Sequence, residues 1–251
     1  MITDKLRALW KTVFGDTDAF LDAFFSIAYS PDRCRYLTVG EDVVSALYWF
    51  DCEYEGGKLA YIYAVATDPK HRGKGLASQL MKETHAHLKV LGYAGTVLKP
   101  ATGLFPFYER LGYQTSGYIQ RFPACAGEPV ALKELSPVEF GQLRRRYLPE
   151  NAVVQEGITL EFLHSFAHFY ASEDALICAC PQEQVIFEYL GNSNSASGIL
   201  ATLGIKEAEI PTFGQKFPHT MFFPLHCDKL PGSGNHSGVI FFLHSEFFSC
   251  A

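Results

Sequence analysis

A basic, glycine-rich segment in the first half of the chain carries the residue types of an anion-binding site. It contains Lys70, Arg72 and Lys74, and Gly73 and Gly75 stand on either side of Lys74. Glycine has no Cβ, so the backbone here can approach a ligand closely. The segment leads into an amphipathic helix, whose first N–H groups and positive dipole end favour a phosphate. We therefore expect a phosphate-bearing ligand at this point of the chain.

The spacing of the glycines excludes two common nucleotide motifs. A dinucleotide fingerprint needs a third glycine in register, and a P-loop needs Ser or Thr after its Gly-Lys pair. Here Lys74 is followed by Gly75, and no third glycine arrives in register. The alternative to a ligand site is a solvated basic turn between a core strand and a surface helix.

A second segment whose residues could take part in a reaction follows one strand later. Residues 107–113 read Phe-Tyr-Glu-Arg-Leu-Gly-Tyr, and the tyrosine at position 108 is an acid that stays protonated at neutral pH. This segment closely resembles F-Y-x-x-x-G-F/Y, motif B of the GNAT (Gcn5-related N-acetyltransferase) superfamily. Residues 65–77 resemble its motif A, whose pyrophosphate loop reads Q/R-x-x-G-x-G/A. Lys70 stands where that loop usually has Gln or Arg.

The resemblance implies acetyl-CoA as the cosubstrate and no metal. Backbone N–H groups must point at the thioester oxygen, which gains charge during acetyl transfer. In the family, a splayed strand before the loop supplies them, here Val65 with its neighbours Tyr63 and Thr67. The leaving thiolate benefits from a proton donor, a position that matches Tyr108; the alternative for Tyr108 is packing beside Phe107. The resemblance assigns these residues to the cofactor: Val65, Ala66, Thr67, Lys70, Arg72, Gly73, Lys74, Gly75, Leu76, Ala77 and Ser78.

A general base is not evident in the sequence. Many family members carry a Glu on the strand before the loop, but residues 59–65 contain no carboxylate. Asp51, Glu53 and Glu55 share one face of the preceding strand, because side chains alternate along a strand. Exposed carboxylates are the norm, so we expect solvated residues there and assign no base. A chain of water molecules would serve the same purpose.

The elements that position these residues follow from hydrophobic periodicity and turn signals. We predict helices at 4–14, 18–29, 75–91 and 105–111, and strands at 34–39, 43–54, 59–67, 94–98 and 114–122. The order strand, helix, strand around the glycine loop predicts a parallel βαβ unit. The predicted fold class is therefore α/β (α+β): a GNAT fold with a mixed, mostly antiparallel sheet and a central parallel βαβ unit. Residues 1–3 leave little room for the first strand that this fold ordinarily has.

The second half reads as a degenerate GNAT-like α/β unit. The Pro- and Gly-rich stretch at 117–129 marks a boundary between residues 1–124, the acetyltransferase domain, and residues 125–251. Residues 191–198 occupy the place of the anion loop but contain no Lys or Arg, and no tyrosine motif follows. We expect residues 144–146, three arginines, to be a solvated helix face. The remaining predicted elements are strands at 130–135, 175–180, 184–190, 209–212, 219–225 and 238–244, and helices at 137–147, 160–170 and 196–203.

This tandem arrangement is similar to that of bacterial acetyltransferases distantly akin to the enhanced-intracellular-survival type. The resemblance rests on Leu-Trp and Phe-Gly-Asp near the start and on Leu-Phe-Pro-Phe-Tyr in motif B. We expect the second unit either to wall the acceptor pocket or to form the surface of a homodimer. Aromatic residues are dense at 213–226 and 241–248, where packing is the default explanation.

Composition limits the remaining choices. The chain has 251 residues, of which 48% are hydrophobic and 19% charged, an ordinary globular composition. No apolar run reaches the ~18 residues of a membrane span, and the first residues lack a signal-peptide layout. Seven cysteines form no C-x-x-C pair, which favours a reducing cytoplasm. No basic stripe is present, so we expect neither nucleic acid nor a membrane as partner.

The leading hypothesis is an acetyl-CoA-dependent N-acetyltransferase in which a primary amine attacks directly within a ternary complex. The acceptor is a small-molecule or peptide amine that the sequence does not identify. A first alternative is a catalytically weak or inactive acyl-CoA-binding sensor or interaction module, which the missing base would explain. A second alternative is an anion-binding protein that does not use CoA.

Overall fold

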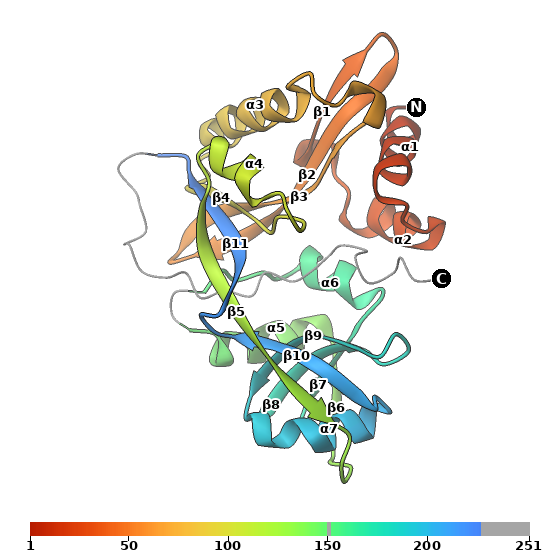
Figure 1. Cartoon of the computed structure of the whole chain (residues 1–251), viewed down its shortest axis with the longest axis vertical. Coiled ribbons are helices and arrows are strands. Elements are labelled where there is room, and N and C mark those ends of the chain that lie inside the picture. Colours follow the sequence, from red (N-terminus) through yellow and green to blue (C-terminus); the bar gives the residue numbers. More distant parts are fainter. Residues whose placement is uncertain (150–151, 227–251) are drawn as a thin grey trace.

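The computed structural model describes residues 1–149 and 152–226, which form two sheets with flanking helices (Figure 1). The larger sheet has seven strands in the order β1-β2-β3-β4-β11-β5-β10, and the smaller has four in the order β6-β7-β8-β9. The predicted strand at 238–244, Cys227 and Cys250, and the aromatic residues at 241–248 lie outside the described residues. The fold is the predicted mixed α/β arrangement.

The first half begins with helices on one face of the large sheet. The helix α1 (Ile2–Phe14) ends at Gly15, and α2 (Asp18–Ala23) continues into a single π-helical turn, Phe24–Ala28. Thr17 caps α2, because its hydroxyl accepts a hydrogen bond from the Phe20 N–H. Ile2 is already helical, so residues 1–3 do not form a strand.

An antiparallel meander follows, as predicted. Its strands are β1 (Cys34–Val39), β2 (Asp42–Tyr54) and β3 (Gly57–Thr67). Glu55 and Gly56 connect β2 to β3 with positive φ angles of 48° and 72°, the signature of a tight hairpin turn. The helix α3 (Leu76–Val90) then returns the chain to β4 (Gly95–Leu98), which pairs parallel to β3. The predicted βαβ unit is therefore confirmed.

The short helix α4 (Phe105–Arg110) leads into β5 (Gln114–Cys125), a long strand that runs from the first half into the second (Figure 1). The boundary expected between residues 124 and 125 falls inside this strand. The division into two domains remains a prediction, and β5 is common to both parts.

The second half is built around the small antiparallel sheet. Its elements are β6 (Lys133–Leu135), α5 (Pro137–Tyr147), α6 (Ile158–His164), β7 (His168–Ala171), β8 (Ala175–Cys180), β9 (Val185–Gly191), α7 (Ala196–Leu203), β10 (Glu207–Phe213) and β11 (Phe217–Pro224). The helix predicted at 160–170 is wrong beyond His164. Phe169 instead pairs with Cys178 on β8 and stacks on Phe140 at 4.1 Å, and this tertiary pairing overrides local helix propensity.

The last described strand, β11, lies in an unexpected place. We expected it to finish a sheet of the second half, but it lies between β4 and β5 of the large sheet (Figure 1). Met221 is paired with Leu98 of β4, and Phe217 is paired with Ile119 of β5. A segment from the end of the described chain therefore completes the sheet that carries the glycine loop.

Each face of the large sheet is covered by its own apolar cluster. On one face α3 and α4 pack through Leu80, Leu88 and Tyr108. On the other face α1, α2 and α6 pack together, and Phe162 of α6 contacts Phe24 at 5.5 Å. The second half thus supplies part of the core on the face of the large sheet that α1 and α2 cover.

Candidate functional site

The strands β3 and β4 pair over three residues only. Leu59, Ala60 and Tyr61 lie opposite Gly95, Thr96 and Val97, and beyond Tyr61 the ladder between them stops. The remainder of β3 pairs only with β2. This separation leaves one edge of β3 without a ladder partner from Ile62 to Thr67, among the described strands.

A β-bulge lies on the separated part of β3. Tyr63 pairs with Tyr48 and Ala66 pairs with Ala46, so Ala64 and Val65 together face the single residue Leu47. Ala64 has a φ of 48°, which is rare for a residue with a Cβ. Bulges of this kind change the direction of a strand and occur next to active sites. The bulge stands at the position where the sequence predicted the thioester-binding backbone.

The turn after β3 is held by its own hydrogen bonds. The Asp68 carboxylate accepts a bond from the Lys70 N–H at 2.7 Å, and the Asp68 N–H donates to the Val44 carbonyl at 2.9 Å. Arg72 donates through Nε to the Thr67 carbonyl at 3.2 Å. The loop therefore has a defined conformation, while the side chains of Lys70, Arg72 and Lys74 remain exposed.

The glycine loop and the start of α3 present unpaired backbone N–H groups. Gly73 and Gly75 have φ angles of 75° and 77°, and a Cβ built at either would meet nothing within 4 Å. The first helical bond of α3 runs from the Gln79 N–H to the Gly75 carbonyl at 2.9 Å. No described backbone carbonyl accepts a bond from any N–H of residues 73–78. The structure therefore brings the predicted loop residues together as an open, positively charged helix N-terminus.

Tyr108 lies on α4 in the apolar cluster on the same face of the sheet as α3. Its side chain is 7% exposed, and Val65 packs against the same cluster. Burial raises the pKa of Tyr108 above its usual value, so its hydroxyl stays protonated at neutral pH. The ring also packs against Phe107 at 5.0 Å and Tyr113 at 5.7 Å. The packing role is thus present, and the proton-donor role of Tyr108 stays a prediction.

A buried polar network, which the sequence did not predict, includes Tyr113, whose ring packs against Tyr108. The Tyr113 hydroxyl lies 2.9 Å from His85 Nε2 and 2.7 Å from the Thr96 hydroxyl. Burial lowers the pKa of His85 to about 4, so this imidazole is neutral at physiological pH. The network joins α3 and β4 to Tyr113, the residue before β5. The helical spacing of His85 from Met81 and Leu88, both buried, was the available sequence signal.

The three carboxylates considered as bases lie at the opposite end of β2 from the loop. Asp51 accepts a hydrogen bond from the Tyr93 hydroxyl and lies 3.4 Å from Lys58 Nζ. Glu53 pairs with Arg145 at 3.2 Å. Asp51 and Glu53 pair with the first residues of β3, whereas the loop follows its last residue. Asp51 and Glu53 are therefore held by polar partners, whereas we expected solvated side chains.

The second half contains a similar strand-helix-strand unit without an anion loop. Its loop between β9 and α7 is occupied by an internal carboxylate, because Asp174 accepts a hydrogen bond from the Ser195 hydroxyl at 2.8 Å. This bond, with others from Ser172 and Asn192, lowers the pKa of Asp174. A carboxylate of the protein itself therefore bonds at this loop, whereas the N–H groups of residues 73–78 stay unpaired in the first.

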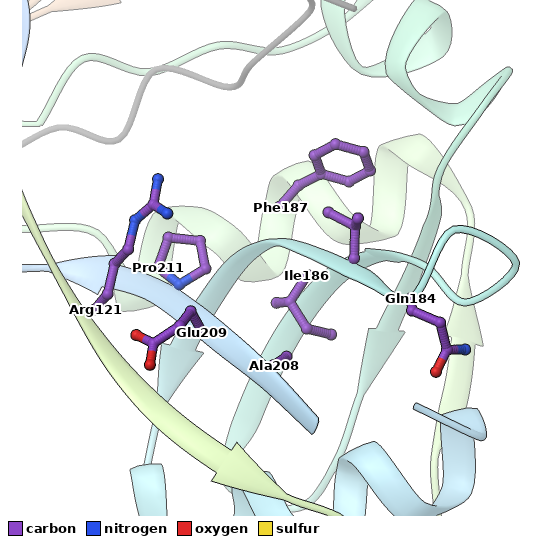
Figure 2. A pocket seen from close by; sticks show the side chains of 8 residues that line it. Arg121, Gln184, Ile186, Phe187, Ala208, Glu209 and Pro211 are labelled. Carbon is purple, nitrogen blue, oxygen red and sulfur yellow. The ribbon is translucent and has the colours of Figure 1, made fainter. Parts of the chain in front are cut away.

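A small pocket of about 190 Å³ lies between β9 and β10 of that unit. Figure 2 shows Arg121 and Pro211 along one side and Ile186 and Gln184 along the other. A larger cavity of about 550 Å³ opens at the end of β4 beside α4. Its lining comprises Lys99, Pro100, Thr102, Gly103, Phe105, Ile119, Arg121, Phe217, Pro218 and His219.

Comparison with known proteins agrees with this geometry. Residues 3–116 match the family model described as Acetyltransferase (GNAT) domain. This part of the chain is therefore a GNAT domain, as its two motifs predicted. No curated protein matches the sequence significantly.

Solved structures with the same fold cover both halves. A GCN5-related N-acetyltransferase from Anabaena variabilis aligns with a TM-score of 0.65 at 14% identity, over 89% of this chain and 70% of that one. One from Kribbella flavida aligns with a TM-score of 0.63 at 18% identity, over 88% and 69%. Eis1 from Mycobacterium abscessus aligns with a TM-score of 0.63 at 11% identity, over 89% and 71%. The fold is thus that of GNAT acetyltransferases, including the predicted tandem arrangement.

Within residues 1–149 and 152–226, no helix has the length and apolar character needed to cross a bilayer. The same residues hold no group of three or more His, Cys, Asp or Glu side chains arranged to bind a metal ion.

Proposed function

We propose that this protein is an acetyl-CoA-dependent N-acetyltransferase in which a primary amine attacks the thioester directly in a ternary complex. One observation carries the proposal: the N–H groups of residues 73–78 are unpaired just beyond the point where β3 separates from β4. A helix N-terminus of this kind suits a pyrophosphate, because its N–H groups and dipole both favour negative charge. Lys70, Arg72 and Lys74 add positive charge beside it.

The unpaired edge of β3 suits the extended arm of coenzyme A. The amide groups of such an arm can bond to an open strand edge as an added strand would. Val65, Ala66 and Thr67 belong to this edge, and the loop and first turn of α3 follow directly. The bulge at Ala64 and Val65 directs backbone groups away from the regular ladder, so a N–H group there is suited to the thioester oxygen.

Tyr108 is proposed as the proton donor to the leaving thiolate. As the amine nitrogen bonds to the carbonyl carbon, the carbon–sulfur bond breaks and its electron pair stays on sulfur. The Tyr108 hydroxyl gives its proton to that sulfur, and the proton released by the amine returns to the phenolate through water. Tyr108 is fully protonated before the reaction, and its raised pKa makes it a weaker acid, so its proton moves to the sulfur only as negative charge develops there.

The test is thiol release from acetyl-CoA measured against a panel of primary amines. The expected result is release that depends on both the amine and acetyl-CoA. Stabilisation by acetyl-CoA with no turnover on any amine would instead support an acyl-CoA-binding sensor. Absence of any CoA-induced shift in melting temperature would contradict the assignment of the cleft to CoA.

A further inference from the structure

The cavity of about 550 Å³ beside α4 borders the apolar cluster that contains Tyr108. Leu98, the last residue of β4, belongs to that cluster, and the next residue, Lys99, lines the cavity. Phe105, in the first turn of α4, lines the cavity and also packs against the cluster. The cavity is therefore adjacent to the group of side chains in which the proposed proton donor lies.

Three side chains of the lining project from one face of β5 and β11. Ile119 of β5 is paired with Phe217 of β11, and residues opposite each other on paired strands lie on the same face of the sheet. Arg121 follows Ile119 by two residues, so its side chain projects from that face as well. All three residues line the cavity. Arg121 thus presents its guanidinium on the side of the sheet that bounds the cavity.

The lining is basic although the protein is acidic. The chain has 27 Asp and Glu against 21 Lys and Arg, a net charge of −6 at pH 7. Among the described residues that line the cavity are Lys99, Arg121 and His219, and none is Asp or Glu. A cavity lined by charges of one sign attracts ligands of the opposite sign. This lining therefore favours a ligand with a negative group.

The guanidinium of Arg121 is available to such a group. It makes no hydrogen bond or ion pair with any side chain in residues 1–149 and 152–226, and the residue is exposed. Glu209 borders the smaller pocket on the other side of Arg121, and Figure 2 shows the guanidinium pointing away from the Glu209 carboxylate. A guanidinium offers parallel N–H donors that match two oxygens of a carboxylate or a phosphate.

The wall between Arg121 and the Tyr108 cluster is apolar. It includes Pro100, Phe105 and Ile119. An aliphatic chain that extends from the basic end of the cavity toward the cluster can bury its methylene groups against these side chains. The lining thus suits a molecule with an acidic group at one end and an apolar chain beyond it.

We infer that this cavity is the acceptor pocket and that the acceptor amine carries an acidic group, a carboxylate or a phosphate, which Arg121 binds. The inference rests on the proposed function and goes beyond it by giving the charge of the substrate. With the acidic group at Arg121, the amine at the other end of the chain is directed toward the thioester beside Tyr108. Arg121 is then a specificity-determining residue, and it takes no part in proton transfer.

The first test compares amines that differ only in the group at the far end. Thiol release is measured with ω-amino acids of increasing chain length, each against the amino alcohol and the diamine of the same length, with rates expressed per unprotonated amine. At the best length, kcat/KM for the amino acid is expected to exceed that for the amino alcohol about tenfold, because a hydrogen bond to a charged group is lost with the alcohol. The diamine is expected to be the poorest acceptor.

A parallel series of ω-aminoalkyl phosphates distinguishes the two acidic groups. The series with the higher kcat/KM identifies the group that the pocket takes. Equal or better turnover of the amino alcohol or the diamine than of both acidic series would overturn the inference.

Two arginine variants make the test specific. Arg121→Gln removes the charge and retains a polar side chain, and its preference for the acidic amine over the alcohol is expected to fall to near parity through a raised KM. Arg146→Gln, on an exposed arginine of α5 outside the lining, removes the same charge and should keep the preference. An undiminished preference in Arg121→Gln, or an equal loss in both variants, would contradict the assignment.

A binding measurement separates this inference from the proposed function. In protein labelled with ¹⁵N-arginine and saturated with CoA, the Arg121 Nε–H resonance is assigned by its absence in Arg121→Gln. The best ω-amino acid or ω-aminoalkyl phosphate is expected to shift it saturably, and the amino alcohol is expected to leave it in place. Thiol release without this shift would overturn the inference alone. The shift without thiol release from any amine would support the acid-binding cavity and contradict the proposed transfer.

Discussion

Arg144 on α5 and Glu188 on β9 form a bidentate ion pair inside the second half. Both bonds, from Nε and Nη2 of the arginine, measure 2.8 Å, and the side chains are 1% and 0% exposed. The expectation that residues 144–146 are a solvated helix face is therefore wrong for Arg144. A paired charge avoids most of the cost of burial, which is why an arginine can lie in this core.

The first prediction concerns this pair. Replacing Arg144 by Met leaves the Glu188 carboxylate buried and unpaired, and we expect a loss of about 3–5 kcal/mol in the free energy of unfolding. The double variant Arg144→Met with Glu188→Leu removes both charges and should recover much of that loss. Urea unfolding measures both. A double variant as unstable as the single one would contradict this account.

The second prediction tests the proton donor. Tyr108→Phe removes the hydroxyl and retains the packing, so kcat should fall by about 10²-fold while the affinity for CoA is unchanged. Steady-state kinetics and calorimetric titration with CoA provide the two values. Tyr36→Phe, on an exposed tyrosine of β1, is the matched control. Unchanged turnover in Tyr108→Phe would leave the residue with a packing role alone.

The third prediction concerns the glycine loop. Gly73→Ala places a Cβ on a backbone with φ of 75°, which costs about 1 kcal/mol and displaces the unpaired N–H groups that we propose bind the pyrophosphate. We expect weaker CoA binding in calorimetric titration. Gly40→Ala, in the β1–β2 turn at φ of 61°, introduces a similar strain away from the site. Equal affinity loss in the two variants would point to general destabilisation.

The fourth prediction is a pH dependence. The pKa of His85 is about 4 in the folded protein, below the unfolded value of about 6.5. Below pH 6.5 the unfolded chain therefore binds a proton that the folded chain does not, and stability falls as pH drops toward 4. The loss attributable to His85 approaches about 3 kcal/mol. His85→Gln should show a flatter stability profile between pH 6.5 and 4, and parallel profiles would contradict this origin.

The fifth prediction tests the position of β11. A Cβ added at Gly95 would lie 2.4 Å from a ring atom of Phe222 and 2.9 Å from the Phe223 carbonyl oxygen. Gly95→Ala should therefore displace β11 from β4 and lower stability by about 1–3 kcal/mol. Thermal unfolding measures this loss. If β11 did not pack there, the substitution would be nearly neutral.

The parts of the site that the sequence predicted are those with local signals. Gly73, Gly75 and Tyr108 lie in two short motifs that resemble those of the GNAT family, and the order strand, helix, strand between them indicates a βαβ connection. The hairpin between β2 and β3 is likewise signalled locally by Gly56 and Gly57, although the turn residues proved to be Glu55 and Gly56. The conformation of a turn depends mainly on its own residues and not on distant segments. The elements of the first half could therefore be predicted from the sequence.

The features that were missed depend on distant partners. Arg144 looks like a surface residue until Glu188 is placed opposite it. Asp16 likewise looks like an exposed turn residue until its carboxylate accepts the bond from the buried Trp10. The position of β11 is a third case. An apolar strand can pair with many strand edges, and its own sequence does not determine which one. Tertiary contacts decide all three.

The insertion of β11 has a consequence for synthesis on the ribosome. β4 and β5 emerge well before residues 217–224, so their facing edges stay open while the whole second half is translated. Contacts of such large sequence separation form slowly, since a long loop must close first. The cavity at the end of β4, which Phe217, Pro218 and His219 help to line, is therefore expected to form last. A nascent chain stalled before Phe217 would expose two unpaired strand edges to aggregation.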